Sequence, residues 1–184
     1  MAILKTSLVC CVLFTLITRP SLAAGFGHGI AFGAHYFHVL GEIDDSREFE
    51  EDGVGYNFSY RLCLSKIFSL DGVLQSYPSG YYQAEKVWSP EVYAVLGRTL
   101  YVGIGALAYR VTWSEPFRDE PGDERDWSDV TYALIGGVEL PLILDVVTLD
   151  INARYVFSDW QEVEEFQEDT LTFGGRVRIY LTRR

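Results

Sequence analysis

Cysteine is scarce in this chain. There are 3 cysteines among 184 residues, and Cys10 and Cys11 both lie in an apolar run at the N-terminus. If that run is removed, Cys63 has no partner left within the chain. A disulfide framework is therefore excluded, and so is any site built from several thiolate ligands.

Long apolar runs and positive charge are also lacking. Beyond the N-terminal run, no stretch approaches the ~20 apolar residues that a membrane-spanning helix needs. The formal net charge is -11. Nucleic-acid binding requires a positive patch, so this acidity argues against it.

The first residues have the pattern of an export signal. Lys5 supplies a positive start, Leu8–Ile17 is an apolar run, and Pro20-Ser21-Leu22-Ala23 offers a small-x-small cleavage site. We predict a cleaved signal peptide over residues 1–23 and a single mature domain over residues 24–184. Loss of Lys5 and Arg19 would change the net charge from -11 to -13, because this segment contains no acid.

What the mature chain does contain is a two-residue period. In Gly53–Ser65, Val54, Tyr56, Phe58 and every following even position are large and apolar, while the odd positions are small or polar. Side chains alternate across a strand, so this segment predicts a strand with one apolar and one polar face.

The same alternation recurs in eight segments, each long enough for a tilted spanning strand of about 9–11 residues. Short connections alternate with longer polar ones along the chain, and this alternation is typical of a bacterial outer-membrane barrel. We therefore predict an all-β, eight-stranded antiparallel up-and-down transmembrane barrel with short periplasmic turns and longer acidic extracellular loops. The expected strands are Gly27–Leu40, Gly53–Ser65, Phe68–Tyr77, Val87–Leu96, Leu100–Trp113, Val130–Pro141, Thr148–Ser158 and Thr170–Leu181.

The orientation of the two faces separates a membrane barrel from a soluble one. The apolar face carries one full charge, Arg110, near a loop. A soluble lipocalin-like barrel would instead turn its apolar face inward and present a richly charged outer face with lysines. The polar face here contains no lysine and is dominated by Gly, Ser, Thr, Asn and Ala. This favours the membrane barrel, with the apolar face toward lipid.

Charges on the polar face would then be enclosed and must be paired, because burial of an unpaired charge costs several kcal/mol. The four arginines and four acids on this face balance. Folding about Lys66 places Arg61 opposite Asp71. We therefore predict a polar plug inside a lumen that side chains just fill; a narrow pore or apolar-solute channel is the alternative. The predicted interior network is Arg61, Asp71, Glu91, Glu139, Asp150, Arg154, Arg176 and Arg178.

Tryptophan lies only where long loops meet strands. Indole rings favour the membrane–water boundary, so these residues predict the outer aromatic girdle. They are Trp88, Trp113, Trp127 and Trp160.

Two features fit the barrel less well. Pro90 lacks a backbone donor, so we expect a bulge or an early end of the fourth strand there. Leu107 and Val111 make the outer half of the fifth strand apolar on both faces.

With these features together, the chain resembles the small eight-stranded outer-membrane β-barrel superfamily, including OmpX-like proteins and the membrane domain of OmpA-like porins. The last strand, Thr172-Phe173-Gly174-Gly175-Arg176-Val177-Arg178-Ile179, resembles the signal read by the barrel assembly machinery. The resemblance implies that Thr172, Gly174, Val177 and Ile179 carry this signal. The chain departs from the family habit because Leu181-Thr182-Arg183-Arg184 has no terminal aromatic residue. We expect no OmpA-like periplasmic domain after this strand.

Catalysis is the main functional alternative, because some barrels of this size modify lipid A. The lipid A deacylase family carries a His-x-Ser motif, but the three histidines here occur as His28-Gly29-Ile30, His35-Tyr36-Phe37 and His38-Val39-Leu40. His38 remains a candidate base on the apolar face, and His35 is expected in the polar interior. A palmitoyltransferase-like activity has no better support. We therefore expect no enzymatic activity, no cofactor and no metal centre.

The predicted loops hold most of the acid. Gly41–Asp52 contains seven acids against Arg47 alone, and Ser114–Ser128 and Asp159–Asp169 are similarly acidic. Such runs are usually solvated, although clustered carboxylates could bind Ca²⁺ or Mg²⁺ weakly. Overall we predict a monomeric outer-membrane protein of a Gram-negative-type bacterium, with a structural or surface-interaction role. Its expected partners are lipopolysaccharide, other membrane lipid and the assembly machinery.

Overall fold

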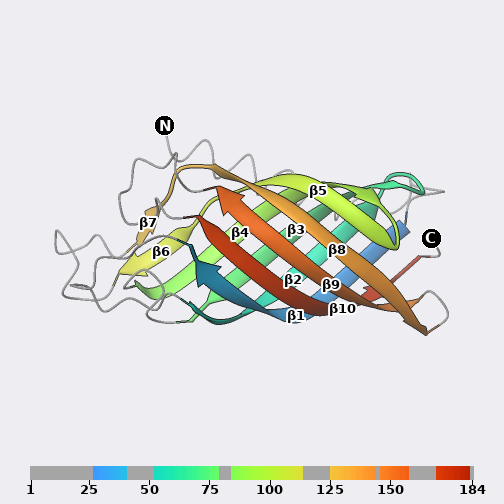
Figure 1. Cartoon of the computed structure of the whole chain (residues 1–184), viewed down its shortest axis with the longest axis horizontal. Coiled ribbons are helices and arrows are strands. Elements are labelled where there is room, and N and C mark those ends of the chain that lie inside the picture. Colours follow the sequence, from blue (N-terminus) through green and yellow to red (C-terminus); the bar gives the residue numbers. More distant parts are fainter. Residues whose placement is uncertain are drawn as a thin grey trace.

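The computed structural model describes residues 27–40, 52–78, 84–113, 125–143, 146–157 and 169–182, and these are almost entirely β-strand. The strands are long and lie side by side, tilted around a common axis (Figure 1). No helix in the described ranges is long and apolar enough to cross a membrane. The strands are β1 Gly27–Val39, β2 Asp52–Cys63, β3 Phe68–Tyr77, β4 Ala84–Gly97, β5 Leu100–Leu107, β6 Arg110–Trp113, β7 Arg125–Trp127, β8 Thr131–Ile143, β9 Val147–Phe157 and β10 Thr170–Tyr180.

The strands form one closed sheet. Their hydrogen-bonded order is β3-β2-β1-β10-β9-β8-β5-β4-β6-β7, and a further β3–β4 pairing completes the circle. β6 continues β5 along the same edge of β4, and β7 pairs with β6 beyond the start of β8. β5 and β6 thus count as one strand of the barrel wall, as do β7 and β8, and we call each such wall strand a stave. The ten segments therefore make eight staves. This confirms the predicted all-β, eight-stranded antiparallel barrel.

The register fixes the slant of the strands. Following direct partners once around the barrel from Gly29 leads through Arg61, Asp71 and Tyr93, and returns to β1 at Val39. The path is thus displaced by ten residues in one circuit. A stagger of this kind accompanies a strand tilt of about 35–45°, and an eight-stranded barrel leaves an interior that side chains just fill.

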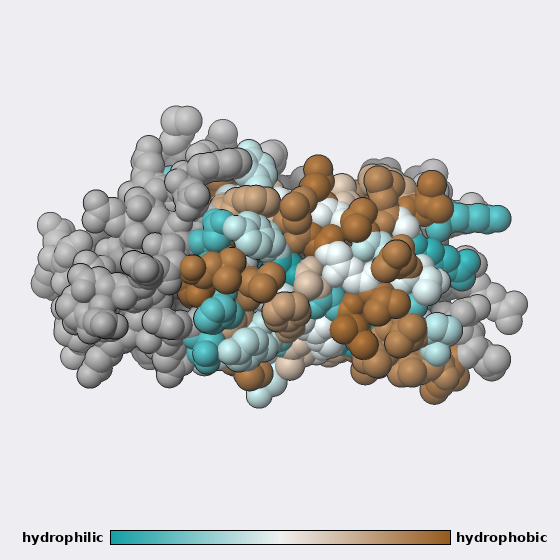
Figure 2. Space-filling model, in the orientation of Figure 1, coloured by the Kyte–Doolittle hydropathy of each residue, from teal (hydrophilic) through white to brown (hydrophobic). Residues whose placement is uncertain are grey.

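The two faces of the barrel have opposite chemistry. Predicted lipid-facing residues project from the outer surface, for example Phe32, Val102 and Ile104, which are 62%, 63% and 66% exposed. The space-filling view shows apolar side chains over much of the described wall (Figure 2). The predicted polar-face residues His35, Asp71 and Arg178 are instead buried in the lumen.

The fourth and fifth strands correct one expectation. β4 continues through Pro90, which pairs with Leu74 of β3, so neither a bulge nor an early strand end occurs at Pro90. The interruption lies in the neighbouring stave, between β5 and β6. Ala108 N–H donates to Pro90 O at 3.4 Å, but Pro90 has no N–H to return a bond. The missing donor therefore loosens the partner strand.

Other differences lie at strand ends. β4 starts at Ala84, before the expected Val87, and part of the segment expected to be a long loop forms β7. The expected strand Leu100–Trp113 is divided into β5 and β6. Register irregularities lie between Ala84 and Lys86 and between Pro141 and Ile143.

Candidate functional site: the barrel lumen and its rims

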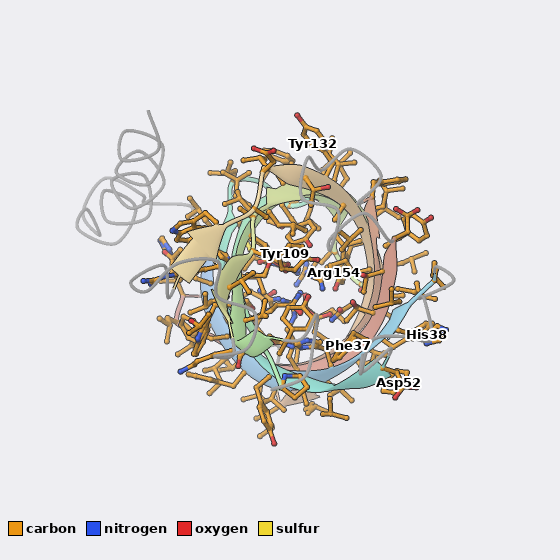
Figure 3. All side chains as sticks on the ribbon, turned by 90° about the vertical axis from the view of Figure 1, so that its left-hand side faces the viewer. Phe37, His38, Asp52, Tyr109, Tyr132 and Arg154 are labelled. Carbon is orange, nitrogen blue, oxygen red and sulfur yellow. The ribbon has the colours of Figure 1, made fainter. Side chains whose placement is uncertain are left out.

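The lumen holds the eight charged residues predicted for it. None is more than 3% exposed, although each would be fully hydrated on a soluble surface. They come from six strands, so no single hairpin brings them together. Viewed along the barrel from the loop end, inward side chains crowd the centre, with Arg154 among them (Figure 3).

Arg61 on β2 is the centre of the larger of two networks. Its Nε and Nη2 donate to both oxygens of Asp71, at 2.9 and 2.6 Å. Its Nη1 reaches across the lumen to Glu139 Oε2 at 2.8 Å. The bidentate geometry is the strongest arrangement for an arginine–carboxylate pair, and it fixes both planes.

Two arginines of β10 complete this network. Arg176 Nε donates to Asp150 Oδ2 at 2.7 Å, and Arg178 Nη2 donates to the same oxygen at 2.8 Å. Arg178 Nη1 also donates to Asp71 Oδ1 at 3.1 Å. Three arginines therefore face three carboxylates, and the network is neutral. We call this set of Arg61, Asp71, Glu139, Asp150, Arg176 and Arg178 the turn-side network.

Tyrosine hydroxyls occupy the remaining carboxylate oxygens. Tyr101 donates to Asp150 Oδ1 at 2.6 Å, and Tyr180 donates to Glu139 Oε1 at 2.6 Å. The Arg61 guanidinium also lies 5.0 Å from the centre of the Tyr101 ring. These tyrosines are absent from the predicted network. The two-residue period from Arg178 places Tyr180 inward, so alternation alone could have found it.

A second, smaller network lies around the Glu91–Arg154 ion pair. Arg154 Nη2 donates to Tyr77 Oη at 2.6 Å and to Thr172 Oγ1 at 3.1 Å. Glu91 Oε2 accepts from Tyr93 Oη at 2.8 Å and from Gln75 Nε2 at 3.1 Å. This set is also neutral, and we call it the loop-side network.

An apolar layer surrounds part of the lumen toward the loops. Leu107, Tyr109 and Val111 of the interrupted fifth stave are each at most 2% exposed. Phe37 and Tyr77 meet edge to face with ring centres 5.4 Å apart, and Tyr77 and Tyr109 are 6.0 Å apart. Leu107 and Val111, which make the outer half of the predicted fifth strand apolar on both faces, are therefore core residues of this layer.

The loop-side rim carries the described part of the predicted tryptophan girdle. Arg110 pairs in register with Trp88 on one side and with Trp127 on the other. Its guanidinium lies 5.8 Å from the Trp127 ring, and Lys86 Nζ lies 5.0 Å from the Trp88 ring. Both cations thus rest on aromatic faces at the rim. The Trp113 side chain and Trp160 lie outside the described residues.

β10 holds the four residues of the predicted assembly signal on both faces. Thr172 and Gly174 face the lumen, whereas Val177 and Ile179 face outward and are 45% and 43% exposed. β10 pairs with β1 along its length and so closes the barrel. Its recognition by an assembly machinery stays a prediction.

The histidines lie in three different surroundings. His28 Nδ1 is 2.5 Å from Tyr60 Oη near the short turns. The His35 ring is buried against Tyr77, with ring centres 5.2 Å apart. His38 lies on the outer surface beside Asp52, its partner in register (Figure 3).

No group of three or more potential metal-ligating side chains occurs in the described ranges. The acidic segments expected to collect divalent cations fall mainly in residues 41–51, 114–124 and 158–168, outside those ranges. Residues 1–23, the predicted signal peptide, also lie outside them.

Comparison with solved structures identifies the fold. The chain is similar to the N-terminal β-barrel domain of Pseudomonas aeruginosa OprF, with a TM-score of 0.55, 12% identity, and coverage of 83% of this chain and 97% of that one. It is also similar to Neisserial surface protein A, with a TM-score of 0.51, 14% identity, and coverage of 84% of this chain and 95% of that one. A third similar structure is Ail of Yersinia pestis, solved with the heparin analogue sucrose octasulfate. Its TM-score is 0.51, with 15% identity and coverage of 84% of this chain and 99% of that one.

These barrels confirm the predicted resemblance. The chain has the fold of the small eight-stranded outer-membrane barrels. No protein-family model and no curated protein sequence matches it.

Proposed function

We propose that this protein is a non-enzymatic outer-membrane barrel with a plugged polar interior, serving a structural or surface-interaction role. The observation that carries the proposal is the pairing of an apolar outer wall with a lumen in which both charge networks are neutral and hydrogen-bonded. The likeness to OprF, Neisserial surface protein A and Ail supports the fold to which this role is assigned.

The outer wall supports placement in a membrane. Soluble monomers rarely expose contiguous apolar patches larger than a few hundred Å². Here Phe32 and Phe58 are direct partners on β1 and β2, and Val102 and Ile104 lie two residues apart on β5, across the barrel. All four are at least 40% exposed, so apolar side chains cover more than one side of the wall. A closed barrel satisfies its backbone hydrogen bonds internally, so it tolerates lipid on this surface. The expected environment is the outer membrane of a Gram-negative-type bacterium, with lipopolysaccharide against the loop-side rim.

The lumen supports a plug over a pore. Arg61 spans the interior between Asp71 on β3 and Glu139 on β8, and Tyr101 and Tyr180 hold the carboxylates from further strands. An ion crossing this section would have to break pairs that are buried and mutually oriented. Planar-bilayer recordings of the purified protein should therefore show no steady single-channel conductance. Reproducible conductance steps would reject the plug and favour the narrow pore.

Localisation has its own test. The protein should co-sediment with outer membranes and resist carbonate extraction, because its wall is solvated by acyl chains. Its recovery as a soluble periplasmic protein would reject the membrane assignment.

Lipid A modification is the enzymatic alternative. His38 is a register partner of Asp52 and lies on the outer surface, so it is the histidine retained as a candidate base. Mass analysis of lipid A from cells with and without the protein should give the same acylation pattern. A mass difference abolished by His38→Ala would overturn the non-enzymatic proposal.

The acidic loops supply the proposed interaction surface. Ail was solved with a polyanionic heparin analogue, but the segment Gly41–Asp52 here carries seven acids and one arginine. Charge repulsion disfavours a polyanion at these loops, and we propose weak Ca²⁺ or Mg²⁺ binding instead. Calorimetric titration with millimolar Ca²⁺ should give heat that is lost in a variant with the acids of this segment changed to amides. No heat from the parent protein would reject cation binding.

Assembly is proposed to use β10, with the protein inserted as a monomer. Substituting Val177 and Ile179 by Ala removes outward apolar contacts of the closing strand, while Val138→Ala and Ile151→Ala do so on β8 and β9. Membrane insertion in cells should fall more for the β10 pair than for the control pair. Equal losses would indicate that only apolar area matters.

A further inference from the structure

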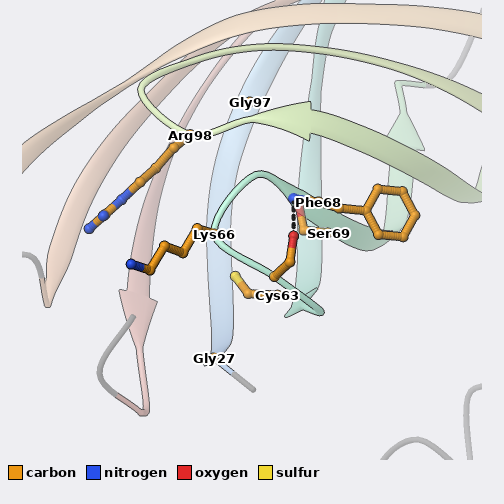
Figure 4. Close-up of a pocket in the computed structure, with 8 residues that line it drawn as sticks. Gly27, Cys63, Lys66, Phe68, Ser69, Gly97 and Arg98 are labelled. Atoms are coloured by element: carbon orange, nitrogen blue, oxygen red, sulfur yellow. Dashed lines mark hydrogen bonds between the residues drawn. The ribbon is translucent and has the colours of Figure 1, made fainter. Parts of the chain in front are cut away.

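The turn-side mouth of the barrel contains a pocket of about 400 Å³. It lies between the turn that joins β2 to β3 and the turn that joins β4 to β5 (Figure 4). The two turns are held together, because Gly97 N–H donates to Ile67 O at 2.8 Å. The lining residues are Gly27, Cys63, Ser65, Lys66, Phe68, Ser69, Gly97 and Arg98.

The charge of this pocket is opposite to that of the chain as a whole. Its two ionised lining residues, Lys66 and Arg98, are both cationic, and the lining includes no carboxylate. Both residues are exposed, and neither has an ion-pair partner among the described residues. Four other arginines of the described chain lie in the lumen and are neutralised there. Within the described part of the chain, the hydrogen-bond donors of Lys66 and Arg98 are therefore available.

The uncharged lining groups are also suited to donate. Ser65 Oγ already accepts from the N–H groups of Ile67 and Phe68, at 3.3 and 3.0 Å, so its hydroxyl proton is directed elsewhere. Ser69 and Cys63 form the buried floor and add a hydroxyl and a thiol. A pocket of donors with two positive charges matches an oxyanion.

The backbone of the pocket is fixed in shape. Gly97 has a φ of 110°, a left-handed conformation that glycine adopts without strain. A Cβ at this position would approach Leu100 O to 2.1 Å. The Gly97–Ile67 hydrogen bond and this turn together hold Arg98 beside the turn that carries Lys66.

We propose that this mouth binds a phosphate group, with Lys66 and Arg98 as its charged donors and Ser65 as a neutral one. Arginine and lysine are the residues that proteins most often direct at phosphate. The phosphate can come from a soluble ion or from a lipid headgroup, because the outward residues Ile67 and Leu100, 65% and 77% exposed, follow closely after the two cations. The proposal is independent of the role assigned to the loops and the lumen.

The test is a titration of the full mature barrel in an uncharged detergent, followed by backbone amide resonances. Inorganic phosphate, added at constant ionic strength, should shift the amides of residues 65–69 and 97–99 along a saturable curve. Lys66→Gln and Arg98→Gln should each weaken the apparent affinity about tenfold, the effect of one lost charge-assisted hydrogen bond. Lys86→Gln is the matched control, since it removes the same charge at the opposite end of the barrel and should leave affinity unchanged.

A second arm identifies the source of the phosphate. Phosphatidylglycerol, titrated into the same micelles, is compared with uncharged diacylglycerol. Saturable shifts from inorganic phosphate support a soluble ligand, and shifts from phosphatidylglycerol alone support a headgroup. Absence of saturable shifts in both arms overturns the proposal. Equal weakening by Lys86→Gln also overturns it, because the effect would then be one of net charge.

Discussion

Arg61 has more buried partners than a single salt bridge provides. It contacts Asp71 through two donors and Glu139 through a third, while Asp71 also accepts from Arg178. Removal of one member therefore leaves an uncompensated charge in a region without bulk water. Such a loss usually costs more than the intact pair contributes to stability.

Arg61→Ala should lower the free energy of unfolding by about 3–5 kcal/mol. Adding Asp71→Ala to that variant should cost little more, because it removes the carboxylate that Arg61 left partly unmatched and restores the charge balance. Urea unfolding of barrels folded into lipid vesicles, followed by tryptophan fluorescence, measures both effects. Additive losses in the double-mutant cycle would contradict their coupling.

The two networks also differ in a testable way. The bonds described for Arg154 go to Glu91, Tyr77 and Thr172, none of which belongs to the turn-side network. The losses caused by Arg154→Ala and Arg61→Ala should then add to within about 0.5 kcal/mol. The same unfolding assay tests this, with the strongly coupled Arg61–Asp71 pair as the internal contrast. A large interaction energy would mean that the lumen acts as one network.

Sequence alternation predicted which side chains enter the lumen, and the turn at Lys66, which joins β2 to β3, predicted that Arg61 pairs with Asp71 in register. The sequence could not predict the hydrogen bonds from Arg61 to Glu139 or from Arg178 to Asp71. Those contacts join residues 78 and 107 positions apart and depend on the diameter and stagger of the closed barrel. The inward tyrosines were missed because an aromatic ring with a hydroxyl suits either face.

At the scale of the strand, small residues set how closely neighbours approach. A Cβ on Gly33 would lie 2.1 Å from Gly175 O and 2.6 Å from the Arg176 Cα. Gly175, beside it on β10, faces outward and has nothing within 4 Å of its ideal Cβ. The β1–β10 seam is thus tight on the lumen side and open on the outer side.

These two glycines form a matched pair. Gly33→Ala should destabilise the barrel by about 1–3 kcal/mol through overpacking at the seam, whereas Gly175→Ala should change stability by no more than about 0.5 kcal/mol. Thermal unfolding in the same detergent compares them directly. Equal effects would show that strand propensity, and not the seam contact, decides the outcome.

Pro90 gives a prediction on local backbone pairing. Pro90→Ala restores an N–H opposite Ala108 O, in a register that is the same on both sides of the break. The backbone amide gained at position 90 should therefore exchange slowly with deuterium, and the Tyr109 region should become more protected. Rapid exchange of that amide would show that the break between β5 and β6 has another cause. The prediction of a bulge or early end in the fourth strand was wrong, because β4 is continuous through Pro90 and the break lies in its partner, between β5 and β6. The sequence alone cannot show which strand is interrupted.

For the molecule as a whole, closure is the property to test. All eight staves are paired on both sides, with β3–β4 and β1–β10 contacts completing the circle. A closed barrel has no unpaired edge at which detergent can begin to separate strands. An unboiled sample should therefore migrate faster than a boiled one on a dodecyl sulfate gel, and Gly33→Ala should lower the temperature at which the fast band disappears. Identical migration before and after boiling would contradict a closed barrel.

The distribution of lumen charge between the two ends of the chain has a consequence for insertion. Arg61, Asp71 and Glu91 come from the first four staves and sum to one negative charge, while Glu139, Asp150, Arg154, Arg176 and Arg178 come from the last four and sum to one positive charge. An unclosed precursor sheet thus has complementary halves, each close to electroneutral. Bringing the halves together lets Glu91 pair with Arg154 and Asp71 pair with Arg178. The stabilisation from these ion pairs is therefore gained when the last strand pairing closes the barrel.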